Sequence, residues 1–248
     1  MAENVNDTSL NKFISQTGFC SRREADKLIS QQRVTINNIV AKTGNRVRET
    51  DEVKIDNLPL RSKENPVYIA FNKPTGISST TDLKDKHNII EYINYPDRIF
   101  PIGRLDKASE GLIFLTNDGD IVNKILRAGN NHEKEYLVTV DKAITAGFLE
   151  TMRNGVNILD TITKKCIVEQ LSKFIFKIIL TQGLNRQIRR MCERLNYNVT
   201  KLVRTRIMNV TLSGIDAGKW RPLTQNEIAD INERVSGSVK TEEASKFK

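Results

Sequence analysis

Residues 103–112 read GRLDKASEGL and lead into the apolar run at 112–115, which is typical of a strand. The segment places one carboxylate, Asp106, between two cations, Arg104 and Lys107. Nearby cations hold a carboxylate ionised, which is the state that a nucleophilic carboxylate needs. Taken alone, such a segment is more often a salt-bridged turn than a reactive site. The rest of the chain therefore decides between the two interpretations.

From residue 67 onward, segments with the pattern of strands outnumber segments with the pattern of helices, and several strands follow one another directly. This order favours an α+β fold with a mixed, mostly antiparallel sheet over a doubly wound fold. We predict strands near 67–71, 111–115, 135–140, 164–169, 174–181, 198–203 and 207–212, and helices near 88–94, 119–127, 145–154, 185–195 and 224–234.

The first part of the chain has the pattern of a small α/β domain. Leu10, Phe13 and Ile14 have helical spacing, and a glycine at 18 ends that helix. Ser21 with Glu24 three residues later predicts a capping box at the start of a second helix. Short alternating runs at 34–36, 39–40, 47 and 53–55 predict a small antiparallel sheet.

Domain boundaries follow these changes of pattern. A chain of 248 residues suits two modest domains. We predict a first domain at 1–61, a linker at 62–66, a larger second domain at 67–235, and a flexible polar tail at 236–248.

Composition argues against several classes of site. The three cysteines are widely spaced and only two histidines are present, so we expect no disulfide framework, no metal site and no Ser-His triad. No apolar run is long enough to span a bilayer and no leader opens the chain, so we expect a cytoplasmic protein without membrane contact. The net charge of +9 points instead to a polyanionic partner.

Positive charge is concentrated between residues 183 and 206. The basic residues in this stretch are accompanied by a single acidic one, Glu193, and such a basic patch suits a nucleic acid. The basic residues are Arg186, Arg189, Arg190, Arg194, Lys201, Arg204 and Arg206.

The helix expected at 185–195 sorts its arginines by face. An apolar stripe lies opposite a row of three arginines, which we expect to contact phosphates. Arg189 belongs to neither row and lies at the edge of the stripe, from which a cation points partly inward and can pair with a buried carboxylate. The stripe is Ile188, Met191, Cys192 and Leu195, and the row is Arg186, Arg190 and Arg194.

The first domain resembles the S4 RNA-binding domain. The resemblance rests on LNKFI at 10–14, SRREA at 21–25 and VTIN at 34–37, in that order. That family presents a basic helix surface to structured RNA, which implies that Arg22, Arg23 and Lys27 contact phosphates. On charge alone, these residues would fit a solvated helix face equally well.

Three further blocks resemble the S4-containing ribosomal pseudouridine synthases of the RsuA type. The similarity extends from the S4-like start to about residue 222, and the runs at 124–130, 132–136 and 204–210 are most similar to the branch that modifies large-subunit rRNA. The blocks are NKPTG at 72–76 with IGRLD at 102–106, EKEYLV at 133–138, and GLNRQIRRM at 183–191 with KLVR at 201–204.

The resemblance implies an enzyme that isomerises a uridine within an RNA chain, without a cofactor. It places the nucleophile on Asp106, and an active-site tyrosine, which stacks on the base or moves a proton, on Tyr136. It also implies that Arg189 is the active-site arginine, which would pair with Asp106. Arg104 would fill the space that the flipped nucleotide leaves, and Leu202 would line the uracil pocket. The ordinary alternatives are a core role for Tyr136 and Leu202 and a surface position for Arg189.

The expected partner is structured RNA, in first place 23S rRNA, bound by a monomer. Two alternatives stay open: the same chemistry on small-subunit rRNA or a tRNA anticodon arm, and a non-catalytic rRNA-binding assembly factor. A non-catalytic copy is expected to lack Asp106, Tyr136 or Arg189, and the chain has all three. The residues predicted to contact RNA are Arg104, Arg22, Arg23, Lys27, Arg186, Arg190, Arg194, Lys201 and Arg204.

Overall fold

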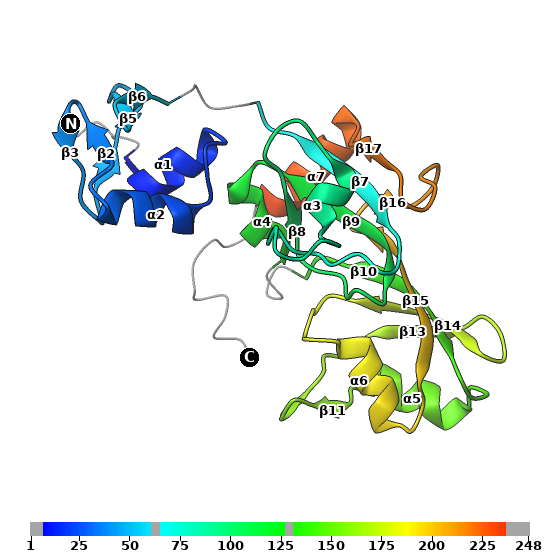
Figure 1. The fold of residues 1–248 in the computed structure, drawn as a ribbon. Helices are drawn as coiled ribbons and strands as arrows, with labels where there is room; N and C mark the ends of the chain where they lie inside the picture. The colour runs from blue at the N-terminus through cyan, green and yellow to red at the C-terminus, as the bar shows by residue number, and fades with distance from the viewer. Residues whose placement is uncertain (1–6, 61–64, 127–130, 237–248) are drawn as a thin grey trace. The chain divides into compact units, whose positions relative to one another are not determined.

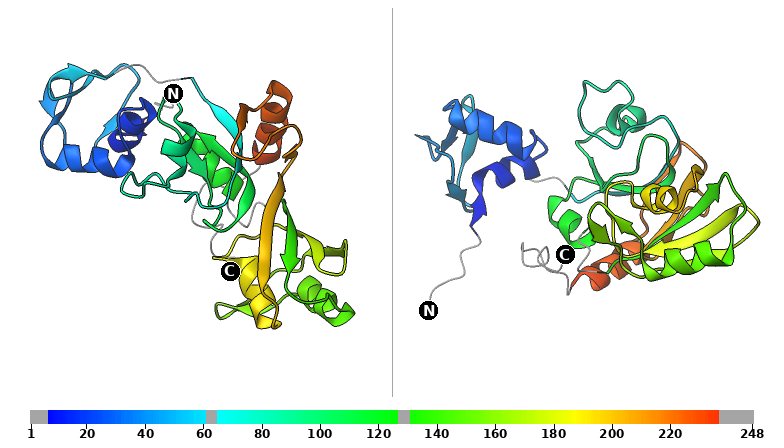
Figure 2. Two further views of the ribbon diagram at one scale, coloured as in Figure 1. Left: turned by 45° about the vertical axis from the view of Figure 1, so that its right-hand side comes forward. Right: turned by 90° about the horizontal axis from the view of Figure 1, so that it is seen from below.

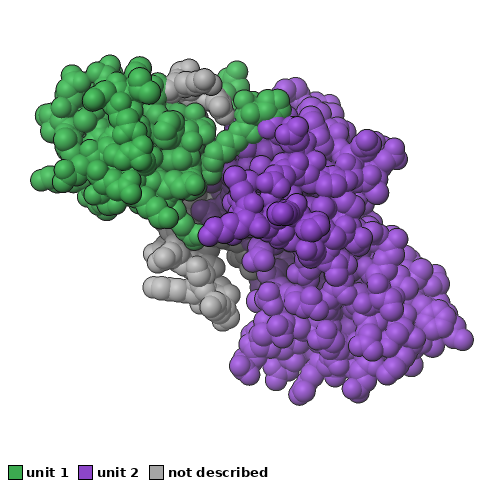
Figure 3. Space-filling view, viewed as in Figure 1, with its two compact units in different colours: residues 1–66, 96–98 green, residues 67–95, 99–248 purple. Residues whose placement is uncertain are grey.

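The computed structural model describes residues 7–60, 65–126 and 131–236. The chain forms two compact units, one of residues 1–66 with 96–98 and one of residues 67–95 with 99–248 (Figure 3). Most of the predicted linker at 62–66, and all but the first residue of the predicted tail at 236–248, lie outside the described residues. No helix in the described ranges is long and apolar enough to cross a membrane.

The first unit packs two helices against a small antiparallel sheet (Figure 1). The predicted capping box is present, because the Ser21 hydroxyl accepts from the Glu24 amide at 3.2 Å and the Glu24 carboxylate accepts from the Ser21 amide at 2.8 Å. The short strands β1 and β6 were not predicted. The elements are β1 (Thr8–Ser9), α1 (Leu10–Gln16), α2 (Arg22–Ser30), β2 (Val34–Ile36), β3 (Ile39–Val40), β4 (Arg46–Val47), β5 (Val53–Ile55) and β6 (Leu58–Pro59).

The helices of this unit bury their apolar faces and expose their cations. Leu10, Ile14, Ala25 and Ile29 pack in one core with β2 and β5. Arg22, Arg23 and Lys27 of α2 are exposed. The unit therefore holds these three side chains on a rigid support.

The second unit is built on one large sheet. Along it the order is β13-β14-β10-β15-β9-β7-β17, with β16 paired to β15 and β8 to β9. All pairs are antiparallel except β9 with β15, so the predicted α+β fold with a mostly antiparallel sheet is confirmed. The strands are β7 (Tyr68–Lys73), β8 (Phe100–Ile102), β9 (Glu110–Thr116), β10 (Lys134–Val140), β13 (Ile167–Gln170), β14 (Ile175–Leu180), β15 (Val199–Ile207), β16 (Val210–Thr211) and β17 (Trp220–Pro222).

Helices cover the two halves of this sheet differently (Figures 1 and 2). The helices α5 (Ala146–Asn154) and α6 (Gln187–Arg194) share one core with β10 and β14. Around β7 and β9, α4 (Gly119–Leu126) and α7 (Gln225–Ser236) pack on one face and α3 (Ile89–Ile93) on the other. Because both faces of β9 are covered, its inner residues form a continuous apolar run.

The two strands predicted at 198–203 and 207–212 are both present, but the predicted boundary between them is wrong. The structure has one long strand, β15, followed by the two-residue strand β16. The first strand continues beyond 203 because β15 pairs with β10 and β9 at Arg204, whose side chain is buried. The additional hairpin of β11 (Asn157–Ile158) and β12 (Thr161–Ile162), and the strands β8 and β17, are too short to leave a periodic signal.

Gly111 brings β15 close to β9. The two strands pair in parallel for two residues, Val203 with Glu110 and Arg204 with Gly111. A Cβ atom on Gly111 would lie 2.3 Å from the Arg204 carbonyl oxygen, and the φ of Gly111 is +109°. Only glycine fits such an approach. This contact places β15 beside the loop that carries Asp106.

Candidate active site

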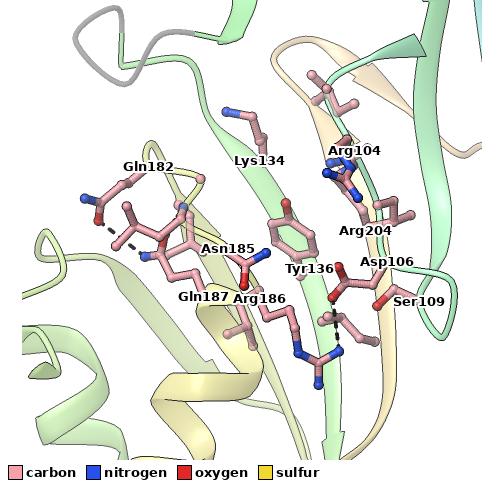
Figure 4. A pocket seen from close by; sticks show the side chains of 18 of the residues that line it. Arg104, Asp106, Ser109, Lys134, Tyr136, Gln182, Asn185, Arg186, Gln187 and Arg204 are labelled. Atoms are coloured by element: carbon pink, nitrogen blue, oxygen red, sulfur yellow. Dashed lines mark hydrogen bonds and ion pairs between the residues drawn. The ribbon is translucent and has the colours of Figure 1, made fainter. Parts of the chain in front are cut away.

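A cleft of about 480 Å³ lies in the second unit, where the two halves of the sheet meet. The loop 103–109, the strands β10 and β15, and the start of α6 form its walls. The structure therefore brings together the residues predicted for catalysis from three separate blocks. The polar and charged side chains that line the cleft are Arg104, Asp106, Ser109, Lys134, Tyr136, Gln182, Asn185, Arg186, Gln187, Arg189 and Arg204 (Figure 4).

The backbone on both sides of Asp106 is held by a neighbouring segment. Before Asp106, the Ser79 hydroxyl accepts from the Leu105 amide at 3.1 Å and donates to the Leu105 carbonyl at 2.8 Å. After Asp106, the Gly76 amide donates to the Lys107 carbonyl at 2.8 Å. The Asp106 side chain keeps 35% of its surface exposed. The loop is thus fixed while its carboxylate stays open to the cleft.

Lys73 holds the segment 74–77, which in turn bonds to the loop of Asp106 through the Gly76 amide. Its ammonium group is fully buried and donates to the carbonyl oxygens of Pro74 at 2.8 Å and Ile77 at 2.9 Å. Burial lowers the pKa of Lys73 to about 8, with a smaller contribution from Arg204. The block at 72–76, which had no assigned role from sequence, therefore braces the loop that carries Asp106.

Tyr136 stands on β10 and faces Asp106 across the cleft (Figure 4). Its neighbours in the sheet are Ile178 of β14 and Arg204 of β15. The Arg204 guanidinium carbon lies 6.0 Å from the centre of the Tyr136 ring. The ring is only half-buried, so one part of it packs in the core and the other is available to a planar ligand.

Arg189 is buried, as its place at the edge of the apolar stripe predicts, but the expected ion pair with Asp106 is wrong. Its guanidinium donates to the carbonyl oxygens of Val199 at 2.9 Å and Ala108 at 3.1 Å, and to the Ser109 hydroxyl at 3.2 Å. Burial lowers its pKa, and the nearby Arg186 adds to this. Arg189 therefore holds the loop that follows Asp106 and does not bind the carboxylate.

The cation that pairs with Asp106 is Arg186, whose Nη1 lies 3.8 Å from Oδ2 of Asp106. The sequence placed Arg186 on the outer face of a helix that includes it. In the structure α6 starts one residue later, and Arg186 is its N-cap in the left-handed region, with φ of 50°. This backbone conformation directs its side chain into the cleft (Figure 4). Because both side chains are partly exposed, the ion pair contributes little to the stability of the fold and mainly orients the Asp106 carboxylate.

Arg204 also departs from the prediction of a surface contact to RNA. Its side chain is buried, and its Nε donates to the Leu112 carbonyl at 2.6 Å. The physical reason is its position on β15, a central strand, where it lines the cleft from within. Leu202, two residues earlier, both lines the cleft and packs in the core. Its position therefore fits the expected pocket lining as well as the alternative of a core residue.

The remaining predicted RNA contacts lie nearer the surface. Arg104 is exposed at the cleft, and Arg194 is exposed on α6. Lys201 is exposed and pairs with Glu110 at 2.9 Å, while Arg190 donates to Asn185 of the preceding loop. The basic patch read from the sequence is therefore a mixture of surface cations and buried ones.

Lys134 was not predicted as a site residue. It lies two residues before Tyr136 on β10, so the two side chains share a face of the strand, and this spacing was a usable signal. Lys134 is 8% exposed and lines the cleft. Burial lowers its pKa to about 8, with Arg204 as a second cause.

Two family models match the chain. The model for RNA pseudouridylate synthase matches residues 67–194, and the model for the S4 domain matches residues 8–53. The chain belongs to the RNA pseudouridylate synthase family. It is thus an RNA pseudouridine synthase with an S4 domain, and the resemblance read from the sequence is confirmed.

Similar proteins agree with this assignment. The dual-specificity RNA pseudouridine synthase RluF of Salmonella typhi is 58% identical over 93% of this chain and 81% of its own length. The ribosomal large subunit pseudouridine synthase B of Bacillus subtilis is 33% identical over 88% of this chain and 93% of its own. A crystal structure of a pseudouridylate synthase covers 90% of this chain and 99% of its own, with a TM-score of 0.67 and 29% identity.

Proposed function

We propose that this pseudouridine synthase isomerises a specific uridine of 23S rRNA, with Asp106 as the nucleophile and the target nucleotide flipped into the cleft. The observation that supports this best is the position of Asp106. Its carboxylate faces Tyr136 across a cleft of about 480 Å³, and the backbone around it is held by Ser79 and Gly76. A nucleophile fixed in this way meets a bound base without a further loss of freedom.

The other groups have separate tasks in this proposal. Tyr136 stacks on the flipped base and takes part in moving its proton. Arg189 keeps the loop after Asp106 in place through its bonds to Ala108 and Ser109. Arg104, exposed at the cleft, enters the gap in the RNA and offsets part of the lost stacking, which is on the order of a few kcal/mol.

The surface cations and the similar proteins support the proposed substrate. Arg22, Arg23 and Lys27 lie on one exposed helix of the S4 domain and suit the phosphates of folded RNA. The names of the similar proteins include both the large ribosomal subunit and dual specificity. We therefore propose 23S rRNA as the first substrate and a second RNA, of the small subunit or the tRNA class, as a further one. The expected setting is a monomer in the cytoplasm.

The test is to incubate the purified protein with unmodified 23S rRNA transcribed in vitro and to map pseudouridine chemically. Wild type is expected to modify one site, and Asp106→Asn none. Small-subunit rRNA and tRNA, treated in parallel, define the range of substrates. Equal modification by wild type and Asp106→Asn would show that Asp106 is not the nucleophile. Tight rRNA binding without any pseudouridine would favour the non-catalytic assembly factor instead.

A further inference from the structure

Besides Arg189, which holds the loop after Asp106, two buried cations line the cleft and have no carboxylate partner among the described residues. Lys134 is 8% exposed and Arg204 is 4% exposed. Among the described residues, the Lys134 ammonium has one hydrogen bond, to the His132 carbonyl at 3.2 Å. Arg204 donates from Nε to the Leu112 carbonyl, while its buried Nη2 has no hydrogen-bond partner within 7–60, 65–126 and 131–236. None of the ion pairs between described residues includes either side chain.

This arrangement opposes folding. A buried cation loses its hydration, and two of them side by side also repel each other. Both effects lower the pKa of Lys134 to about 8. An apolar side chain of similar size at 134 would remove this cost, so stability does not explain the charge at this position. A buried, unpaired donor that lines a cleft is most simply explained by an anionic ligand there.

Pseudouridine formation itself produces an anion. When the bond between N1 of the base and C1′ of the ribose breaks, its electron pair leaves with the base, and the negative charge spreads over N1, O2 and O4. C5 then forms the new bond to C1′, C5 gives up its proton and N1 gains one, so that no atom or electron is gained or lost overall. Fixed cations at the edge of the base would stabilise this charge.

We propose that Lys134 and Arg204 compensate the negative charge on the carbonyl oxygens O2 and O4 of the detached base. The inference rests on the proposed function, which puts the base between Asp106 and Tyr136. Lys134 and Tyr136 share a face of β10, and the Arg204 guanidinium lies 6.0 Å from the Tyr136 ring centre (Figure 4). A base stacked on that ring would lie in the same cleft as the two cations.

A phosphate of the RNA is a less suitable ligand for this pair. A phosphodiester carries a ribose on each side, so it binds best at an open surface. Arg104 and Arg186 are exposed at the same cleft and suit that task. Lys134 and Arg204 are almost wholly enclosed, which suits the edge of a planar ring and strengthens every charge interaction there.

The test compares Lys134→Met with Lys134→Arg and with Lys142→Met as a matched control. Lys142 follows β10, is exposed, and donates to the Asn196 carbonyl outside the cleft. With in vitro transcribed 23S rRNA, Lys134→Met is expected to lower the single-turnover rate constant by about 100-fold. RNA affinity should change by less than about threefold, since the charge is needed only as the bond breaks. Lys134→Arg should recover most of the rate, and Lys142→Met should equal wild type.

A pH profile adds a measurement that a purely structural role would not change. The charged or titratable groups that face Lys134 are Arg204 on β15 and His132 before β10. Because its lowered pKa is about 8, Lys134 is charged below that pH and loses its charge above it. The wild-type rate should therefore fall as the pH rises through about 8. In Lys134→Arg that fall should be absent, because arginine stays protonated.

Three results would overturn the inference. One is a wild-type rate for Lys134→Met, and another is a pH profile that Lys134→Arg leaves unchanged. The third is weaker binding with a reduced salt slope at an unchanged saturating rate, which would identify a phosphate contact. Asp106→Asn separates this inference from the proposed function. If Asp106→Asn stays active, the proposed function fails. If Asp106→Asn is inactive and Lys134→Met is fully active, only the inferred role of Lys134 and Arg204 is rejected. Arg204 is not substituted, because its bond to Leu112 joins β15 to β9.

Discussion

The basic residues of α2 and the buried basic residues of the cleft belong to the same residue types but occupy opposite environments. Arg22, Arg23 and Lys27 are exposed on a helix of the S4 domain, whereas Arg189 and Arg204 are buried among backbone carbonyls. Exposed cations recognise the shape and charge of RNA at little cost in folding. The buried cations bind backbone carbonyls, and we propose that Lys134 and Arg204 also stabilise charge that arises during the reaction. Net charge alone therefore does not show which basic residues of this chain lie on the surface and which are buried in the cleft.

Arg189→Met is expected to have the largest effect, and this effect is on the stability of the fold. Arg194→Met, on the same helix, is the control. Loss of Arg189 leaves the carbonyls of Val199 and Ala108 without their donor, which should lower the free energy of unfolding by about 2–4 kcal/mol. Arg194 is exposed, so its loss should cost less than about 0.5 kcal/mol. Thermal unfolding measures both. Equal destabilisation of the two variants would show that burial does not separate the roles.

A smaller effect is expected from Ser79→Ala, which removes both hydrogen bonds to the backbone of Leu105. The loop before Asp106 then loses one of its supports, and the single-turnover rate constant should fall by about 10-fold, while RNA affinity stays the same. Ser213→Ala, at an exposed position outside the cleft, is the control. A rate like that of wild type would mean that Gly76 and Arg189 hold the loop without Ser79.

The smallest effect on the reaction itself is expected from the triple variant Arg22→Ala, Arg23→Ala and Lys27→Ala. Because these side chains are exposed, RNA binding should weaken and the slope of log affinity against log salt should flatten by up to about 3. The rate constant at saturating RNA should not change. The measurement is binding at several salt concentrations. An unchanged slope would place the RNA contacts of this domain elsewhere.

Much of the fold could be predicted from periodic runs. The capping box of α2 and the apolar run of β9 depend on neighbouring residues alone, and such signals are readable in a sequence. The continuation of β15 beyond residue 203 was not predicted, because the burial of Arg204 depends on two strands that lie far away in the chain. The short strands β8 and β17 likewise exist only through their partners in the sheet.

The site was predicted in part. Asp106, Tyr136 and Arg189 belong to separate blocks, and the structure brings all three to one cleft. Their detailed contacts depend on backbone geometry that the pattern does not contain. Arg186 pairs with Asp106 because α6 begins one residue after it and its own φ is 50°. Lys134 shares a strand face with Tyr136, and alternation alone could have indicated it.

Gly111 has a consequence for how this fold can change over evolution. A single added methyl group there would meet the Arg204 carbonyl and force β15 away from β9. Leu202 and Arg204 would move with their strand, while Asp106 would stay with its loop. The absence of a side chain at Gly111 thus sets the distance between the two strands, and a substitution in the walls of the cleft leaves this distance unchanged only as long as position 111 stays glycine.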